Sequence, residues 1–341
     1  MNSCHCEEKN LSELKKQARK ALNAVAFTSV ITTALSYLFY TVISVLMPFF
    51  VRLLSKLLMA MGSGSVYAMA FAENFIASEE LSWFVSIAAT LICFFIPFLL
   101  LAKSIMYKET SGIISFNGPV LKSLPFVYCT TLMMASAVSA VAGGIFSFVF
   151  PDAYGLINTD TVGMYGSSGR PVSLVLSFIS MCIFAPIAEE FAYRGVAFGY
   201  LKKFGVSFAA ISSSVLFGLA HANPEQIAYA VIFGLVLCAV TSKTDNLKTA
   251  IIMHFINNLI GYIRAYIIPL IGFDMADVVF GVIYSLTVGA FAIIGITILF
   301  KTLKCNTDVE EKASVPMVCF FCAGTVFAII LTATDILLGT I

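Results

Sequence analysis

The segment Ala185-Pro-Ile-Ala-Glu-Glu-Phe-Ala-Tyr-Arg-Gly195 places two adjacent carboxylates and an arginine inside an otherwise apolar run. An ionised side chain at the centre of a membrane helix costs about 2.5 kcal/mol or more, so such residues indicate a functional site with a partner. Glu190 and Arg194 are four residues apart, which places them on one helical face as an ion pair. Glu189 points about a quarter-turn away and lacks such a counter-charge.

Two later apolar segments carry further polar side chains. The first reads Phe217-Gly-Leu-Ala-His221 and the second reads His254-Phe-Ile-Asn-Asn258, so these two segments hold two of the three histidines of the chain. His254 and Asn258 are four residues apart and project from one helical face, whereas Asn257 is predicted to point elsewhere. The sequence therefore predicts that several buried polar groups come together as one site.

The composition is that of a membrane protein. Of 341 residues, 60% are hydrophobic and 11% are charged, and the mean hydropathy is +0.96. These values lie outside the usual range of soluble domains. The net charge of +1 and the lack of a basic patch interleaved with aromatic residues exclude nucleic acid as an expected partner. The cysteines in apolar runs predict small core residues rather than disulfides.

Nine apolar runs are long enough, or nearly so, to provide the roughly 20 residues that a helix needs to cross a bilayer. They are 24–51, 81–102, 124–150, 172–200, 204–222, 225–241, 247–269, 277–300 and 315–338. We therefore predict an all-α, polytopic bundle of about nine transmembrane helices. Asn223-Pro224 joins the short fifth and sixth runs, which predicts a tight hairpin whose tip stops inside the protein. The connection 52–80 is predicted to hold a broken or interfacial helix.

The distribution of lysine and arginine predicts the orientation in the membrane. Lysines gather in alternate connections, represented by Lys103, Lys203 and Lys248, whereas the opposite connections carry a surplus of acidic residues. By the positive-inside rule, this alternation predicts a multi-pass protein of the cell membrane with a cytoplasmic N-terminus and an external C-terminus.

We divide the chain into four parts. They are a cytoplasmic amphipathic segment 1–23, the first three helices with their outer loops 24–171, a central segment 172–268 with helices four to seven, and the last two helices 269–341. The polar first part, with its spaced leucines, suits a helix on the membrane surface. Because no internal repeat is evident, transporters built from duplicated halves are disfavoured.

The motifs E-E-x-x-x-R, F-x-x-x-H and H-x-x-x-N, in this order and on separate helices, resemble those of the CPBP family of intramembrane proteases. That family includes type 2 CAAX-prenyl endopeptidases and Abi-like bacteriocin-processing or immunity proteins. The resemblance covers about residues 172–268, and nothing comparable is found in the first half of the chain. It implies a hydrolase, either a metalloprotease or a glutamate protease.

The resemblance also implies roles for the matching residues. These are water activation for Glu189 and His221, support for Glu190 and Arg194, and oxyanion stabilisation for His254 and Asn258. Phe217 is expected to pack under His221. An imidazole and a carboxamide on one helical face suit a developing oxyanion, for which each donor contributes about 3–4 kcal/mol in a dry site. A carboxylate with an imidazole can hold a water molecule and take a proton from it, which is general base catalysis.

The sequence leaves the involvement of a metal open. His221, His254 and Glu189 form a credible zinc triad with an open position for water. However, the H-E-x-x-H spacing of soluble zinc proteases is absent. We favour a water activated directly by protein side chains over a water bound to Zn²⁺, and both alternatives stay open at this point.

The leading hypothesis is an intramembrane endopeptidase that cuts a peptide or a membrane-anchored protein, with the lipid bilayer as its other partner. The alternative is a non-catalytic membrane protein of the same fold that acts as an immunity factor or scaffold. An ion or proton carrier would also contain buried Glu, His and Arg. The missing repeat and the lack of matching broken helices disfavour that class.

Overall fold

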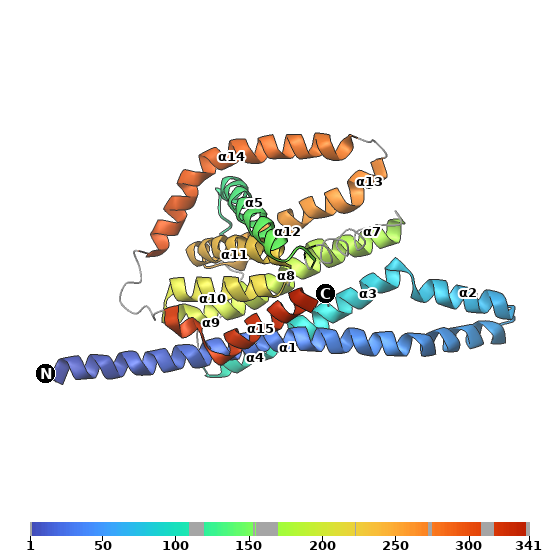
Figure 1. Cartoon of the computed structure of the whole chain (residues 1–341), viewed down its shortest axis with the longest axis horizontal. Helices are drawn as coiled ribbons and strands as arrows, with labels where there is room; N and C mark the ends of the chain where they lie inside the picture. Colours follow the sequence, from blue (N-terminus) through green and yellow to red (C-terminus); the bar gives the residue numbers. More distant parts are fainter. Residues whose placement is uncertain are drawn as a thin grey trace.

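The computed structural model describes residues 2–108, 119–152, 154, 170–221, 223–271, 275–307 and 317–338, and every regular element in these ranges is a helix (Figure 1). The all-α prediction is thereby confirmed. Seven helical stretches are long and apolar enough to cross a membrane, which confirms a polytopic bundle. They are Leu11–Ala60, Glu79–Met106, Leu124–Val149, Pro171–Phe204, Pro224–Thr244, Leu247–Ile271 and Val278–Leu299.

All nine predicted runs coincide with helices, but two of these helices are shorter than a full span. These two are the apolar helices Val206–Leu219 and Ala323–Ile336. The elements around the core are α3 (Glu79–Ala89), η1 (Thr90–Phe95), α4 (Ile96–Lys108), α5 (Leu124–Val149), α12 (Leu247–Tyr262), η5 (Ile263–Ile267), α13 (Ile268–Ile271), α14 (Ala276–Thr307), η6 (Met317–Phe320) and α15 (Ala323–Leu338). Six cysteines in the described ranges are buried and unpaired, as predicted.

The first helix is much longer than predicted. Helix α1 (Asn2–Ala60) joins the predicted surface segment to the first span without a break. At 1.5 Å per residue it rises about 88 Å, nearly three times the thickness of the hydrocarbon layer. Arg52 does not end the helix because arginine is a good helix former. The chain turns only at Gly62, whose φ is 93°, and α2 (Ser65–Ile76) runs back along α1 (Figure 1).

The central helical stretch is interrupted twice by π-helical turns. It consists of α7 (Pro171–Phe178), η2 (Ile179–Phe184), α8 (Ala185–Glu190), η3 (Phe191–Phe198), α9 (Gly199–Leu201) and η4 (Lys202–Phe204). Such π-helical turns are frequent at functional sites. Here they lie on both sides of α8, the short helix that carries Glu189 and Glu190.

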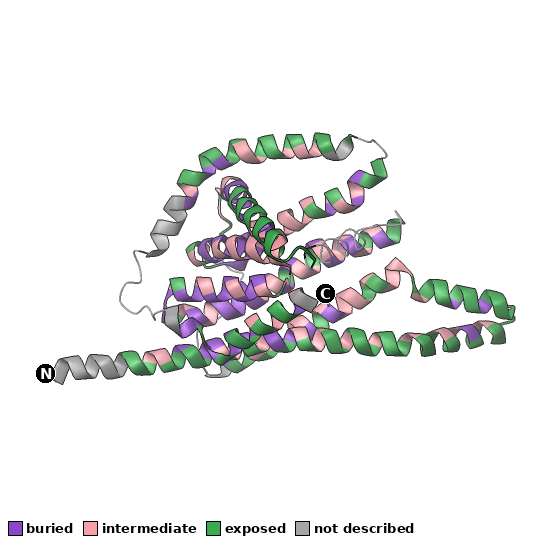
Figure 2. Ribbon diagram, viewed as in Figure 1, coloured by how far each residue is buried: buried purple, intermediate pink, exposed green. Residues whose placement is uncertain are grey.

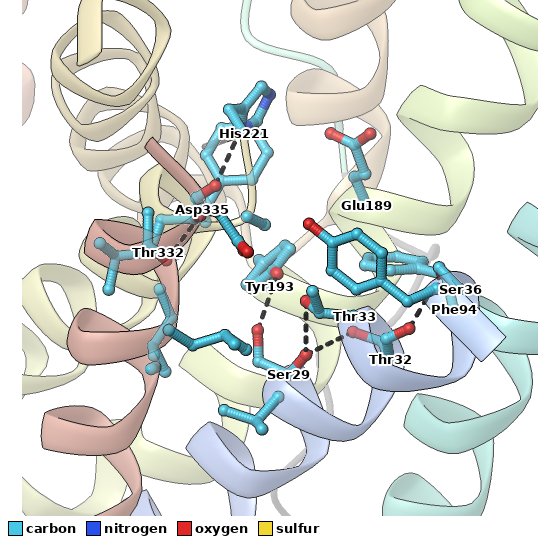
Figure 3. Close-up of a pocket in the computed structure, with 18 of the residues that line it drawn as sticks. Ser29, Thr32, Thr33, Ser36, Phe94, Glu189, Tyr193, His221, Thr332 and Asp335 are labelled. Atoms are coloured by element: carbon cyan, nitrogen blue, oxygen red, sulfur yellow. Dashed lines mark hydrogen bonds between the residues drawn. The ribbon is translucent and has the colours of Figure 1, made fainter. Parts of the chain in front are cut away.

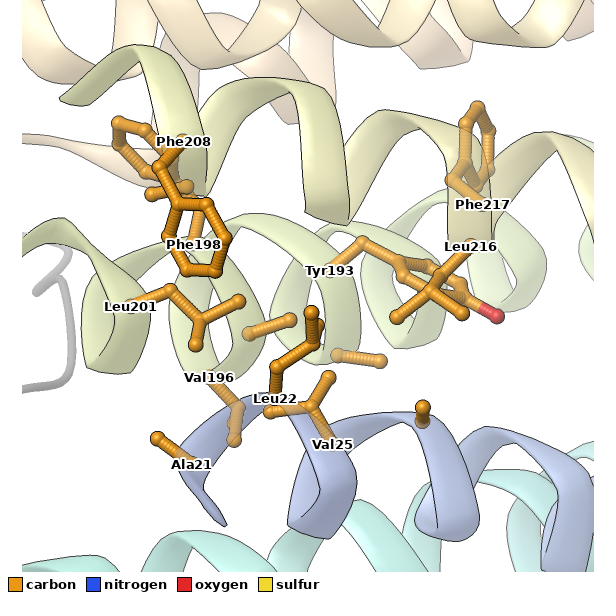
Figure 4. Close-up of a cluster of buried hydrophobic side chains, with 14 of the residues drawn as sticks. Ala21, Leu22, Val25, Tyr193, Val196, Phe198, Leu201, Phe208, Leu216 and Phe217 are labelled. Atoms are coloured by element: carbon orange, nitrogen blue, oxygen red, sulfur yellow. The ribbon is translucent and has the colours of Figure 1, made fainter. Parts of the chain in front are cut away.

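The hydrophobic core surrounds this central stretch. Leu22 and Val25 of α1 pack with Val196 and Leu201 of the central stretch and with Phe208 of α10 (Val206–Leu219) (Figure 4). Buried residues concentrate in these helices, whereas α14 and the far end of the α1–α2 pair are largely exposed (Figure 2). Exposed apolar side chains on helices of this length fit a lipid environment.

The predicted tight hairpin is formed by α10 and α11 (Pro224–Thr244). Asn223 caps α11 by accepting hydrogen bonds from the backbone N–H groups of Glu225 and Gln226. Helix α10 begins at Val206 after Gly205, whose φ is 122°. With 14 residues it rises about 21 Å, less than the roughly 30 Å of a hydrocarbon layer. His221 therefore lies in the turn beyond a helix that does not cross the layer, rather than inside a longer helix.

Candidate active site

Glu190 and Arg194 form the predicted ion pair. Arg194 Nη1 donates to Glu190 Oε1 over 3.0 Å, and both side chains are completely buried. The backbone of α11 approaches the guanidinium closely at Gly234, where a Cβ atom would lie 2.8 Å from Arg194 Nη2. Glycine at this position therefore leaves the room that the arginine occupies.

His254 connects the two adjacent carboxylates. Its Nδ1 lies 2.8 Å from Glu190 Oε1, and its Nε2 lies 3.7 Å from Glu189 Oε2. Because a carboxylate only accepts, Nδ1 carries the hydrogen of this bond, and Nε2 is the ring nitrogen that faces Glu189. The sequence-based assignment joined Glu189 to His221, whereas the structure places Glu189 next to His254.

Phe217 lies at the centre of the cluster. Its ring and the His221 ring form a T-shaped contact with a centroid distance of 4.9 Å and an interplanar angle of 86°, which confirms the predicted packing. The Arg194 guanidinium carbon lies 4.2 Å from the Phe217 centroid, and the His254 ring contacts Phe217 at 5.9 Å. The aromatic ring therefore holds both histidines and stabilises the buried cation through its π face.

His221 is held by the backbone of its own turn. Its Nδ1 lies 2.9 Å from the carbonyl oxygen of Phe217. A carbonyl only accepts, so this nitrogen carries the hydrogen of the bond, and Nε2 is left for other contacts. Within the described residues no hydrogen bond joins His221 to Glu189, although both side chains line the same two cavities.

Asn258 binds a carbonyl that Pro186 leaves without a helical donor. In η2 the N–H of Ala185 donates to Ser180, five residues earlier. The next bond in this register would run from residue 186 to Met181, but proline has no N–H. Asn258 Nδ2 donates to this Met181 carbonyl over 2.9 Å. One amide hydrogen of Asn258 therefore attaches α12 to the helix that carries the carboxylates.

This bond predicts a compensating pair of substitutions. Asn258→Ala should lower the free energy of unfolding by about 1–3 kcal/mol, because the part-buried Met181 carbonyl loses its donor. Adding Pro186→Ala should recover part of that loss, because alanine supplies the backbone N–H that proline lacks. Thermal unfolding of the detergent-solubilised single and double variants measures both effects. A double variant no more stable than Asn258→Ala alone would contradict the explanation.

Asn257 belongs to the site, contrary to the prediction that it points elsewhere. Its Nδ2 donates to Asn258 Oδ1 over 3.3 Å, and its Oδ1 accepts from the Tyr229 hydroxyl over 2.5 Å. Helical periodicity missed this contact because adjacent side chains on α12 meet only when a third residue, here Tyr229 of α11, turns one amide toward the other. A polar residue beside a predicted site residue was the only sequence signal.

Two cavities meet at the predicted site residues. The first, of about 410 Å³, lies between α1, α10 and α15 (Figure 3). The second, of about 400 Å³, lies between α8, α11 and α12 and is lined by His254, Asn257 and Asn258. Glu189 and His221 line both cavities, as does Phe217. The two groups predicted to activate water therefore lie where the two cavities adjoin.

Buried polar atoms without a hydrogen bond concentrate in this cluster. Among the described side chains, seven buried polar atoms lack a partner, and four of them belong to Glu189, Glu190 and Arg194. Buried groups in folded proteins are usually satisfied, so a concentration of exceptions indicates a site whose groups serve a function. These residues form a membrane-embedded acid–base cluster.

The donor set does not form a three-ligand metal centre. Glu189, His221 and His254 line the same cavity. Nevertheless, in the part of the chain that the structure describes, no three His, Cys, Asp or Glu side chains are close enough together to hold a metal ion. We therefore derive no step of the chemistry through a metal.

Comparison with known proteins shows which family the central part of the chain is similar to. Residues 171–260 match the family "Type II CAAX prenyl endopeptidase Rce1-like". Over 119 residues the chain is 28% identical to the Bacillus subtilis (strain 168) protein named "Putative membrane peptidase YdiL", a match that covers 35% of this chain and 47% of that protein. No solved structure matches the chain significantly.

These matches confirm the resemblance to the CPBP family of intramembrane proteases. The family match contains all three motifs, from Glu189 to Asn258. Helices α1, α5 and α15 lie entirely outside the family match, which therefore says nothing about them.

Proposed function

We propose that the chain is an intramembrane endopeptidase that hydrolyses a peptide bond of a membrane-associated peptide or protein. The contact of 3.7 Å between His254 Nε2 and Glu189 Oε2, at the boundary of two cavities, carries this proposal. The gap is too long for a direct hydrogen bond, and a water placed to one side of it would reach both atoms. The match to a peptidase family supports the same reaction class.

The proposed reaction begins with a water held between Glu189 and His254. Glu189 takes one proton as general base while the water oxygen bonds to the carbonyl carbon of the peptide. The second amide hydrogen of Asn258, beyond the one donated to Met181, stabilises the oxyanion. The C–N bond then breaks, and the proton on Glu189 passes to the leaving amine. Glu190 and Arg194 hold His254 in the required tautomer.

Cleavage of membrane-spanning peptides by the purified, reconstituted chain tests this proposal against the scaffold alternative. We expect the parent to cut at least one member of a diverse peptide set. The combined variant Glu189→Gln, His221→Ala and Asn258→Ala should cut none, because it lacks the base, the second imidazole and the oxyanion donor. No product from the parent would favour a scaffold, and equal product from parent and variant would show that these three residues do not carry out the cleavage.

We further propose that the N-terminus is cytoplasmic. The N-terminus, the α9–α10 turn and the last turn of α14 lie at one end of the bundle (Figure 1). Reporter domains fused after Lys103, Lys203 and Lys248 should therefore all report the cytoplasm, since positive-inside charge assigns these three positions to one side. An external signal at Lys203 would contradict this orientation.

A further inference from the structure

Tyr229 of α11 lies outside the three motifs, yet it ends a row of hydrogen bonds that includes the proposed oxyanion donor. Its hydroxyl donates to Asn257 Oδ1 over 2.5 Å, and Asn257 Nδ2 donates to Asn258 Oδ1 over 3.3 Å. Asn258 Nδ2 donates to the Met181 carbonyl over 2.9 Å. All four residues line the second cavity. We call these three successive hydrogen bonds the amide row.

The amide row has only one consistent direction. The two ends of a carboxamide have nearly the same shape, so hydrogen-bond partners decide which end faces which neighbour. The Met181 carbonyl only accepts, so it requires the nitrogen of Asn258. If Asn257 turned over, its oxygen would face the oxygen of Asn258, and two acceptors would meet. In the observed orientation, the Tyr229 hydroxyl supplies the donor that the Asn257 oxygen needs.

The ring of Tyr229 is held in place by aromatic packing. It stacks on Phe233, one helical turn later on α11, with a centroid distance of 5.8 Å and an interplanar angle of 24°. Phe233 is buried, and its ring meets the His254 ring in a T-shaped contact at 5.9 Å. Tyr229 is thus connected to Asn258 through Asn257 and to His254 through Phe233.

We propose that Tyr229 is a positioning residue for peptide hydrolysis, which it serves through Asn257 without touching the substrate. This inference rests on the proposed function. Asn257 holds the oxygen of the Asn258 carboxamide and Met181 holds one amide hydrogen, so the second amide hydrogen keeps a fixed direction for the oxyanion. A preorganised donor needs no reorganisation at the moment of reaction. Loss of the Tyr229 hydroxyl therefore slows the chemical step rather than weakening peptide binding.

Tyr229→Phe removes the hydroxyl and keeps the ring. The reconstituted variant should cut membrane-spanning peptides with a kcat roughly threefold to tenfold below that of the parent, as expected for one lost hydrogen bond, and with an unchanged KM. Tyr262→Phe is the matched control, because the Tyr262 hydroxyl also donates a part-buried hydrogen bond, to the Leu174 carbonyl over 2.9 Å. Tyr262 is not among the described residues that line the two cavities, so its variant should keep the parent kcat and KM.

A double-variant cycle distinguishes positioning from a general structural role. If Tyr229 acts through Asn257, its hydroxyl has no route to Asn258 once Asn257 is replaced. Asn257→Leu should lower kcat at least as much as Tyr229→Phe, and the double variant should cut no more slowly than Asn257→Leu alone. Thermal unfolding of the same four proteins should show the same lack of additivity. Asn257→Leu also tests the amide row if Tyr229→Phe does not fold.

The outcomes separate this proposal from the proposed proteolysis. A parent that cuts peptide and a Tyr229→Phe variant with the same kcat would overturn the positioning role alone. Losses of kcat that multiply in the double variant, or an equal loss in Tyr262→Phe, would do the same. If the parent cuts no peptide while the unfolding losses are not additive, the amide row stands and the proposed proteolysis fails.

Discussion

Arg194→Ala should destabilise the protein by about 3–5 kcal/mol, because it leaves the buried Glu190 carboxylate without its cation. Both side chains of the pair are completely buried, and Nη1 lies 3.0 Å from Oε1. His254 still donates to Glu190 in the variant, but a hydrogen bond does not replace a counter-charge. The measurement is thermal unfolding of the detergent-solubilised protein.

Two comparisons isolate the cause of this loss. Glu190→Gln with Arg194→Met should regain stability, because no lone charge remains and the glutamine carbonyl still accepts from His254. Arg170→Ala should cost less than about 1 kcal/mol, since Arg170 meets Glu80 over 3.3 Å with its side chain 60% exposed. Equal stability of Arg194→Ala and the parent would show that the buried pair is not formed.

Replacing Glu189 by glutamine and replacing Glu190 by glutamine should have different effects on activity and stability. Glu189→Gln should reduce cleavage by roughly 10²–10⁴-fold, because it removes the general base. Its stability should stay near that of the parent, since the Glu189 side chain is 24% exposed and its contact with His254 is 3.7 Å long. Cleavage and thermal unfolding, measured on the same preparation, separate the two effects.

Glu190→Gln is the matched control for this prediction. It should lower stability as strongly as Arg194→Ala does, because the buried guanidinium loses its counter-charge. Full activity in Glu189→Gln would contradict its role as base. Equal loss of stability in both glutamine variants would contradict the assignment of one carboxylate to chemistry and the other to support.

Local periodicity predicted the contacts that depend on one helix. The pairing of Glu190 with Arg194 follows from a spacing of four, and the Asn223-Pro224 turn follows from the chemistry of a helix N-terminus. The packing of Phe217 against His221 is of the same kind. Such contacts depend only on the spacing of residues along one helix, and this spacing can be read directly from the sequence.

Contacts between helices could not be predicted in the same way. His254 of α12 meets both carboxylates of α8, a contact that depends on how these two helices pack. The spacing within one helix says nothing about the position of another. The place of Asp335 in the wall of the first cavity depends on where α15 packs, and α1 continues through Pro48 to Ala60, which the sequence pattern did not predict.

Hydrolysis in ¹⁸O-labelled water tests the central claim most directly. The reconstituted parent and Glu189→Gln are incubated separately with the membrane-spanning peptides, and the masses of the products are measured by mass spectrometry. The account predicts that the parent releases fragments whose new carboxyl group carries one ¹⁸O atom, and that Glu189→Gln releases almost none. Products of equal amount and label from both proteins, or no labelled product from the parent, would contradict the claim that Glu189 activates water for peptide hydrolysis.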